Sequence, residues 1–375
     1  AEALKKVVKH ARVQCESHVR TPENANYVIA SGQADMVSIV RGQIADPHLA
    51  NKAREGRPED VRPCLSCNQM CWGRRYRDYW ISCLINPSAG REFEWGGDRF
   101  ERAVMAKKVL VIGGGVAGLE AARVAAERGH QVTLAEAGPR LGGQFRLAGL
   151  APRRQQIIDF IDWFERQLTK LQVKVLLNTP LDAAEARSLG ADEIIVATGS
   201  LPDGKGFQRA MPEHDTLPGI ERGNVWSVED VMAKAAKLGP TVLLLDETAN
   251  WKGAGAALAM AELGHKVIVV TGAPTVMAEM ARTNADVMAR TRMRELGVRA
   301  FAEAVMLEWH GNGATVQQSG ARPERIEADS LVTATTNQPE RWLSDELGAP
   351  TIGDATAARN AAIAIYEGRK LALKL

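Results

Sequence analysis

The strongest constraint on the fold lies in residues 108–136, where a strand, a glycine turn, a helix and a second strand follow one another directly. The first strand leads into Gly113, Gly115 and Gly118, which form a G-x-G-x-x-G motif at the start of the helix. The first glycine allows a tight turn, the second lets a pyrophosphate approach the backbone, and the third permits close packing of helix and strand. Because the motif stands in its complete β–α–β context, we expect a dinucleotide-binding fold with phosphates at the helix N-terminus.

Glu136 follows the second strand of this unit, Gln131–Ala135. A carboxylate at that position accepts hydrogen bonds from the ribose hydroxyls of a bound nucleotide, which favours an unphosphorylated ribose. The alternative is a glycine-rich turn that binds no ligand.

The second constraint is a group of cysteines in residues 62–83. Four of the five cysteines of the chain lie there with the spacing C-x2-C-x3-C-x11-C, namely Cys64, Cys67, Cys71 and Cys83. Four thiolates suit either a zinc ion or an iron–sulfur cluster. Zinc sites usually combine two close cysteine pairs, whereas one compact triplet followed by a single cysteine favours a 4Fe–4S cluster. Two disulfides or free thiols are the alternative.

The composition is that of an ordinary globular protein. The 375 residues allow two or three domains, and the net charge of +2 gives no reason to expect nucleic acid or a membrane as a partner. No apolar run is long enough to span a bilayer, and the N-terminus lacks a signal-peptide pattern. Cysteine is scarce outside the cluster, where only Cys15 remains, which predicts a reducing, cytoplasmic location.

Residues 1–62 are interpreted as one β–α–β–α unit. Val7–Gln14 is the first predicted strand, Thr21 caps the helix that follows, Asp35–Val40 is the second strand, and residues 47–55 are helical. Such a parallel pair closes no core by itself, because each strand needs further neighbours.

Residues 34–47, with the sequence ADMVSIVRGQIADP, resemble the last strand and helix of the old yellow enzyme type of flavin barrel. The resemblance implies that Arg41 contacts the phosphate of FMN, as the arginine after the last strand does in that family. The preceding strand usually ends in Gly-Arg in this family, whereas Ser17-His18 stands here. The first six barrel strands are absent from the chain, so we expect another polypeptide, or a further part of the same one, to supply them.

The cysteine spacing is similar to that of the 2,4-dienoyl-CoA reductase and trimethylamine dehydrogenase group, multidomain relatives of old yellow enzyme. Aromatic residues among the cysteines would shield the cluster from water or serve simple packing; they are Trp72, Tyr76, Tyr79 and Trp80. Three later motifs resemble the FAD-binding domains of disulfide reductases and imply FAD, or ADP alone, as the first nucleotide. They comprise Gly142, Gly143 and Gln144 after the acid, Thr198 and Gly199 after a strand, and Gly353 and Asp354 near the C-terminus.

A second strand–helix–strand unit spans residues 241–270, with the loop sequence DETANWK. The fingerprint positions fall on Thr248, Asn250 and Gly253 when counted from the helix, or on Asp246, Thr248 and Trp251 when counted from the strand. The bulk of Trp251 and the carboxylates of Asp246 and Glu247 are expected to oppose a phosphate there. In this the chain resembles the amine dehydrogenase branch, whose equivalent domain does not use NAD(P)H. Residues 303–333 alternate and predict antiparallel strands.

The predicted fold is therefore α/β, with four parts in sequence. They are the remnant of a flavin (β/α)8 barrel at 1–62, an iron–sulfur loop and linker at 63–105, a Rossmann-like FAD- or ADP-binding domain of disulfide-reductase type at 106–240 and 330–375, and a degenerate NAD(P)-binding-like domain at 241–329. The cofactors implied are a 4Fe–4S cluster, FAD or ADP, and an FMN shared with the missing barrel.

The resemblance implies an oxidoreductase of the trimethylamine dehydrogenase branch, closest to bacterial demethylases of N-methylated amino acids or betaines. Electrons would pass from a small N-methylated amine through FMN and the cluster to a soluble electron-transfer flavoprotein or ferredoxin-like carrier. An NAD(P)H-dependent 2,4-dienoyl-CoA or enoate reductase and a non-catalytic electron-transfer subunit are the alternatives. We also expect an oligomer, with catalytic residues that lie outside this chain.

Overall fold

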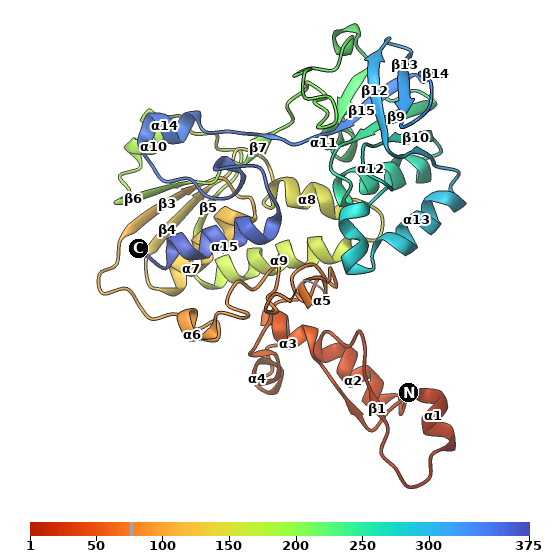
Figure 1. The fold of residues 1–375 in the computed structure, drawn as a ribbon. Coiled ribbons are helices and arrows are strands. Elements are labelled where there is room, and N and C mark those ends of the chain that lie inside the picture. The colour runs from red at the N-terminus through yellow and green to blue at the C-terminus, as the bar shows by residue number, and fades with distance from the viewer. Residues whose placement is uncertain (76–77) are drawn as a thin grey trace.

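The computed structural model describes residues 1–75 and 78–375, so Tyr76, one of the aromatic residues among the cysteines, lies outside the described residues. The chain forms two α/β lobes and an N-terminal arm that projects away from them (Figure 1). None of the described helices is long and apolar enough to cross a bilayer.

A four-stranded parallel sheet in the order β5-β4-β3-β6 forms the centre of the first lobe. Alternate residues of β3 face opposite sides, so that Val109 and Val111 pack on α7, α9 and α15 while Leu110 and Ile112 pack towards α10 and α14. The strand–helix–strand unit expected at the fingerprint is confirmed. The elements are β3 (Lys108–Ile112), α7 (Val116–Glu127), β4 (Gln131–Ala135), α8 (Gly143–Gly149), α9 (Gln155–Lys170), β5 (Lys174–Leu176), α10 (Ala183–Ser188), β6 (Glu193–Val196), β7 (Ser200–Leu201), α14 (Trp342–Leu347), η4 (Gly353–Ala355) and α15 (Ala361–Ala372).

The second lobe holds a five-stranded parallel sheet in the order β11-β10-β9-β15-β8. Helices α11, α12 and α13 cover one face, and an antiparallel sheet of β12, β13 and β14 covers the other. The elements are η2 (Ile220–Arg222), β8 (Val225–Ser227), α11 (Val228–Met232), β9 (Thr241–Asp246), α12 (Trp251–Glu262), β10 (Lys266–Val270), η3 (Ala278–Thr283), α13 (Asp286–Glu295), β11 (Arg299–Phe301), β12 (Ala304–Trp309), β13 (Gly313–Gln318), β14 (Glu324–Glu327) and β15 (Ser330–Ala334). Between the lobes, β16 (Gln338–Pro339) pairs with β7.

Strand pairing differs from the boundaries expected at residues 240/241 and 329/330. Both β8 and β15 belong to the sheet of the second lobe, although they lie outside residues 241–329. The antiparallel strands expected in residues 303–333 are confirmed for β12 to β14, whereas β15 runs parallel to β9. An apolar pattern indicates that a strand is buried, but it does not indicate which sheet the strand joins.

The arm consists of α1 (Glu2–Val7), β1 (Gln14–Cys15), α2 (Pro22–Ala30), β2 (Met36–Val37), α3 (Arg41–Ala45) and α4 (Leu49–Arg54). The cap at Thr21 is confirmed, since its hydroxyl accepts a hydrogen bond from the Asn24 amide at 3.2 Å. The strand predicted at Val7–Gln14 is wrong, because its first residue ends a helix and only Gln14 pairs. The second strand is also shorter than predicted. With one neighbour each, β1 and β2 form a ladder of only two residue pairs.

Residues 58–105 contain η1 (Pro58–Asp60), α5 (Trp72–Arg75) and α6 (Glu92–Trp95). The latter part was expected to be a linker running over the next domain. Only its first residues are buried, since Asn86 and Ser88 are 2% and 1% exposed. Residues 91–105 are intermediate or exposed, as expected for a segment that runs over a surface.

Candidate functional site

The fingerprint loop leaves an open surface in front of the N-terminus of α7. Gly113 has φ +109°, and a Cβ there would lie 2.2 Å from the Ala197 carbonyl oxygen, while a Cβ at Gly118 would lie 2.0 Å from the Gly113 carbonyl oxygen. A Cβ at Gly115 would meet no atom within 4 Å. Gly115 is also the N-cap residue and supplies no side-chain cap, so the first amides of α7 remain available to an anion.

Glu136 lies beside this loop and stabilises it through hydrogen bonds. Its carboxylate accepts hydrogen bonds from the amides of Gly114 and Gly138, both at 2.7 Å. Gly142 and Gly143 reach the same place, because the Gly142 amide donates to the Gly114 carbonyl at 2.7 Å and a Cβ on Gly143 would lie 3.4 Å from the Gly115 Cα. The two glycine turns and the acid therefore form one continuous backbone surface.

The remaining predicted residues line the next part of this surface. The Gln144 amide donates to the Ser200 hydroxyl at 3.1 Å, and that hydroxyl donates to Asp354 at 3.3 Å. Burial raises the pKa of Asp354 from its ordinary value. Thr198 donates to the Glu340 carbonyl at 2.7 Å, and a Cβ at Gly353 (φ +67°) would lie 2.8 Å from Ala117.

Gly199 has φ +81°, and a Cβ there would meet no atom within 4 Å. The structure thus brings the fingerprint loop, the Gly142–Gly143 turn, the end of β6 and η4 together. Residues far apart in sequence therefore lie around one glycine-lined surface at the N-terminus of α7.

A second candidate site is the cysteine pocket, lined by Cys64, Cys67, Cys71 and Cys83 together with Arg41 and Ile44. All four cysteines are free thiols, so the structure contains neither of the disulfides considered from the sequence. Burial raises the pKa of Cys67 to about 11 and that of Cys83 to about 12, because the surroundings disfavour a thiolate.

Sulfur is the donor type of this pocket, and it suits a zinc ion as well as an iron–sulfur cluster. Among the described residues, no group of three or more His, Cys, Asp or Glu side chains is arranged to hold one metal ion. A zinc site requires four sulfurs at about 2.3 Å from one centre, whereas an iron–sulfur cubane spreads its four ligands over a wider frame. Four thiols line one shared pocket, which is the donor set that either kind of centre uses.

Arg41 lies at the edge of the cysteine pocket. Its guanidinium donates to the Asn68 side chain at 2.6 Å, and the Asn68 amide donates to the Thr283 carbonyl at 3.1 Å. Asn68 has φ +57°, a left-handed conformation that asparagine tolerates. The cysteine loop therefore connects the arm with η3 of the second lobe, a contact that no local sequence pattern indicated.

In the second lobe, the loop before α12 satisfies its own amides. The helix begins at Trp251 with Asn250 as its N-cap, so counting from the helix is correct and Thr248, Asn250 and Gly253 hold the fingerprint positions. The Asn250 side chain accepts from the Lys252 amide at 2.7 Å. The Asp246 carboxylate accepts from the amides of Thr248 and Ala249, both at 3.0 Å.

The electrostatic part of the sequence expectation for this loop is wrong. Asp246 is 0% exposed, and burial raises its pKa. Glu247 accepts from the Arg209 amide at 3.0 Å and forms an ion pair with its guanidinium at 3.5 Å. Neither carboxylate faces the loop as a free anion, whereas the amides of Thr248, Ala249 and Lys252 already have side-chain partners.

Lys252 is a functional candidate that the sequence interpretation missed. Its ammonium donates to Asn337 at 2.6 Å and forms an ion pair with Glu229 at 3.0 Å. Asn337 in turn donates to Gln144 at 3.2 Å, which links the loop before α12 to the turn that follows Gly143. These residues lie too far apart in sequence for any spacing rule to reveal the connection.

A buried ionic network joins the first lobe to the preceding segment. Glu120 accepts from Arg123 at 3.0 Å and from Arg369 at 2.7 Å. Asp98 accepts from Arg62 at 2.7 Å and pairs with Arg369 at 2.9 Å. The nearby guanidinium groups hold the pKa values of Asp98 and Glu120 below their usual range, although burial opposes the shift. Arg62 precedes the cysteine loop, so this network fixes that loop to α7 and α15.

Comparison with known proteins agrees with this geometry. The pyridine nucleotide-disulphide oxidoreductase family matches residues 107–361. The chain is 33% identical to a cinnamate reductase of Clostridium sporogenes over 99% of this chain and 54% of the relative. It is 30% identical to an N,N-dimethylglycine/sarcosine dehydrogenase of Chromohalobacter salexigens over 99% of this chain and 58% of the relative.

Among solved structures, 6-hydroxypseudooxynicotine amine oxidase from Pseudomonas geniculata N1 superposes with a TM-score of 0.94 at 30% identity, covering 100% of this chain and 57% of that one. The chain spans about half the length of the curated relatives it matches. The relatives include enoate-type reductases as well as amine dehydrogenases and demethylases. The chain therefore belongs to the pyridine nucleotide-disulphide oxidoreductase family and is a flavoprotein oxidoreductase.

Proposed function

We propose that the chain is part of an iron–sulfur flavoprotein that oxidatively demethylates a small N-methylated amine. Electrons leave the substrate through FMN and a 4Fe–4S cluster and pass to a soluble carrier such as an electron-transfer flavoprotein or a ferredoxin. The relatives named as dehydrogenases or demethylases of methylated amines support this assignment, among them a probable N-methylproline demethylase that is 39% identical over 68% of this chain. In this assignment the FMN is bound by the barrel, of which residues 1–62 would form only the last part.

The observation that carries the proposal is the convergence of four cysteines on one pocket. In this assignment the four thiolates hold the cluster, which transfers single electrons. Arg41, at the edge of the pocket, would contact the FMN phosphate and so place the flavin near the cluster. The open surface before α7 would hold FAD or an ADP moiety, with Glu136 directed to the ribose.

Iron analysis of the protein after anaerobic purification tests the cluster. We expect about four irons per chain together with the absorbance of a cluster. Each of the changes Cys64→Ser, Cys67→Ser, Cys71→Ser and Cys83→Ser should lower the iron content strongly, since each removes one ligand. Cys15→Ser is the matched control, because Cys15 lies in β1 outside the pocket. Stoichiometric zinc without iron would contradict the proposal.

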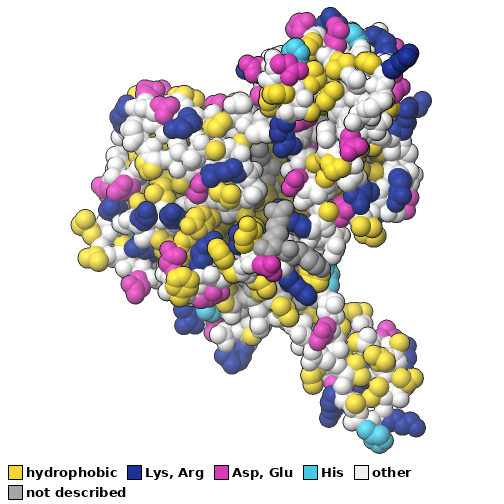
Figure 2. Space-filling model, in the orientation of Figure 1, with side chains coloured by type: hydrophobic (Ala, Val, Ile, Leu, Met, Phe, Trp, Pro, Cys, Tyr) yellow, Lys and Arg dark blue, Asp and Glu magenta, His cyan; other side chains and the backbone are white. Residues whose placement is uncertain are grey.

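The arm supports the proposal that further polypeptide completes a barrel. Neither α1 nor α2 contains a buried residue, and large apolar side chains are exposed along the arm; they include Leu4, Val7, Tyr27, Met36 and Val40. Figure 2 shows that hydrophobic side chains gather on the surface of the projecting arm. Two strands with one neighbour each leave unpaired ladder edges.

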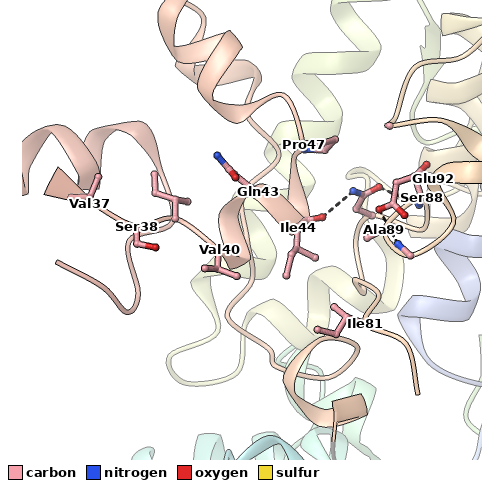
Figure 3. Close-up of a pocket in the computed structure, with 14 residues that line it drawn as sticks. Val37, Ser38, Val40, Gln43, Ile44, Pro47, Ile81, Ser88, Ala89 and Glu92 are labelled. Carbon is pink, nitrogen blue, oxygen red and sulfur yellow. Dashed lines mark hydrogen bonds between the residues drawn. The ribbon is translucent and has the colours of Figure 1, made fainter. Parts of the chain in front are cut away.

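A hollow of about 800 Å³ lies beside these strands (Figure 3). It is formed by the end of β2 and by α3 on one side, and by the segment around Ala89 on the other. Side chains of Val40 and Ile44 line it from the arm, and Ile81 lines it from the cysteine loop. The missing strands would both cover the open edges of the arm and fill this hollow.

Native mass spectrometry of the purified assembly tests this part of the proposal. We expect a mass above the 40.6 kDa of this chain, with barrel sequence in another chain or in a longer form of this one. An oligomer of this subunit would appear as a multiple of the subunit mass. A stable monomer of 40.6 kDa whose arm amides are protected from hydrogen exchange would contradict it.

An NAD(P)H-dependent enoate reductase is the second candidate function, and the cinnamate reductase relative favours it. The closed loop before α12 opposes it, because the amides of Thr248, Ala249 and Lys252 already have side-chain partners. A non-catalytic electron-transfer subunit is the remaining candidate. It would contain iron and nucleotide but would not be reduced by substrate when barrel sequence is present.

A further inference from the structure

Asn68 connects three parts of the chain through hydrogen bonds. Its backbone carbonyl accepts from the Gly73 amide at 2.7 Å. Its side-chain nitrogen donates to the Thr283 carbonyl at 3.1 Å, and its side-chain oxygen accepts from Arg41 at 2.6 Å. Because a carbonyl can only accept and a guanidinium can only donate, these two partners determine the orientation of the Asn68 amide group.

Close packing keeps Asn68 in this arrangement. Thr283, the last residue of η3, is 2% exposed. A Cβ at Gly73 would lie 3.1 Å from the Asn68 carbonyl oxygen and 3.4 Å from Thr283 Cγ2, so the cysteine loop and η3 are in contact here. The Asn68 backbone has φ +57°, which asparagine tolerates better than most residues. Asparagine thus serves both the left-handed turn and the two side-chain hydrogen bonds.

Arg41 carries a charge that the described chain does not neutralise. It lines the cysteine pocket, and within residues 1–75 and 78–375 it forms no ion pair. Arg41 begins α3, and Ile44 of the same helix lines both the cysteine pocket and the hollow beside the arm. Helix α3 therefore borders the four cysteines and also the space that the proposed barrel would fill. A guanidinium in that place suits an anionic group of a ligand.

We propose that Asn68 is a positioning residue, which orients the guanidinium of Arg41 for the phosphate of FMN. The inference rests on the proposed function, in which Arg41 contacts that phosphate. The Asn68 oxygen accepts one N–H of the planar guanidinium, which restricts its rotation and gives the remaining N–H groups a fixed direction. Because the Thr283 carbonyl holds Asn68 in turn, η3 of the second lobe determines the direction of the phosphate contact.

The test compares FMN with riboflavin, which has the same ring system but no phosphate. Each flavin is titrated into the complete protein, with its barrel present and its own flavin removed, and binding is followed by flavin fluorescence. Excess ADP is added to occupy the surface before α7. A change that affects only the phosphate contact alters the affinity for FMN and leaves the affinity for riboflavin as it was.

The variants are Asn68→Gly, Asn68→Asp and Arg41→Met. Glycine keeps the left-handed backbone and removes the side chain, whereas aspartate keeps an acceptor for Arg41 and adds a negative charge. Asn224→Gly is the matched control. Asn224 has the same φ of +57° and donates to the Gly311 carbonyl at 3.1 Å, but it does not line the cysteine pocket.

We expect Asn68→Gly to weaken FMN binding about fivefold, because the guanidinium is no longer oriented before FMN binds. Asn68→Asp should weaken FMN binding about a hundredfold, as much as Arg41→Met, since its carboxylate neutralises the charge that the phosphate requires. Riboflavin affinity should stay unchanged in all variants, and Asn224→Gly should bind both flavins as the wild type does.

Two results of Asn68→Gly would overturn the inference. One is an equal loss of affinity for FMN and riboflavin, which would show that the change disturbs the whole flavin site. The other is unchanged FMN affinity beside a loss in Arg41→Met. If Asn68→Gly does not fold, Asn68→Asp decides, and wild-type FMN affinity in that variant overturns the inference. Unchanged FMN affinity in Arg41→Met would instead contradict the FMN contact of the proposed function.

Discussion

NADPH at micromolar concentration is expected neither to bind to this protein nor to reduce it. Hydride transfer from NADPH requires its pyrophosphate to rest on the loop before α12, with the amides of the helix N-terminus directed at the phosphates. Here the side chains of Asp246 and Asn250 accept hydrogen bonds from those amides, and Trp251 stands at the first helical position. Losing the main anchoring site should weaken binding about a thousandfold or more, which is roughly 4 kcal/mol.

Stopped-flow mixing and calorimetry measure this expectation directly. The flavin absorbance should stay unbleached after mixing with NADPH or NADH, whereas dithionite should bleach it in the same sample and so serves as the control. Nucleotide released on denaturation should still be FAD or ADP, which confirms that the first site is intact. Micromolar NADPH binding, or turnover with NADPH as the sole reductant, would restore the reductase assignment.

Glu120→Ala is expected to destabilise the protein by about 3–5 kcal/mol, the range for removing one partner of a buried ion pair. Glu120 is 0% exposed and accepts hydrogen bonds from both Arg123 and Arg369. Without its carboxylate, two guanidinium groups remain inside the lobe with too little negative charge. The midpoint of urea unfolding, followed by tryptophan fluorescence, measures the loss.

Glu127→Ala is the matched control for this change. Glu127 lies on the same helix and pairs with the same Arg123 at 2.9 Å, but 30% of its side chain is exposed, so its removal should cost about 1 kcal/mol or less. The difference between the variants should also depend on pH. The folded-state pKa of Glu120 is lowered, so its stabilisation is present above the unfolded value and is lost as the pH falls through the folded value. Equal midpoints for the two variants at neutral pH would show that the network contributes little.

The first nucleotide unit could be predicted because its information is local. The apolar run of β3, the three glycines and the acid after β4 determine a short stretch whose turns and caps depend only on neighbouring residues. The Thr21 cap was predictable for the same reason. The strands of the arm were harder to predict from the sequence. Because β1 and β2 pair only with each other, their apolar pattern does not determine how long each strand is.

The loop before α12 shows why the effect of a charged residue cannot be predicted from the sequence alone. Asp246 and Glu247 suggested a repulsive surface, yet one is buried beneath the loop and the other faces Arg209. The bulk at Trp251 was foreseen, but its contact with Arg154 was not. The sequence gives the charged residues, but their burial and their ion-pair partners depend on the tertiary structure.

The sequence by itself determined the family, the nucleotide fingerprint and the candidate ligands, because each depends on residue types at short, fixed spacing. Only the tertiary structure decided which strands share a sheet, which arginines are compensated and which helix N-terminus remains open. The pairing of Glu120 with Arg369 and the contact of Lys252 with Asn337 join segments far apart in the chain. Such contacts arise because packing the sheets brings these segments together, and the strength of a charge there depends on burial, which no local pattern encodes.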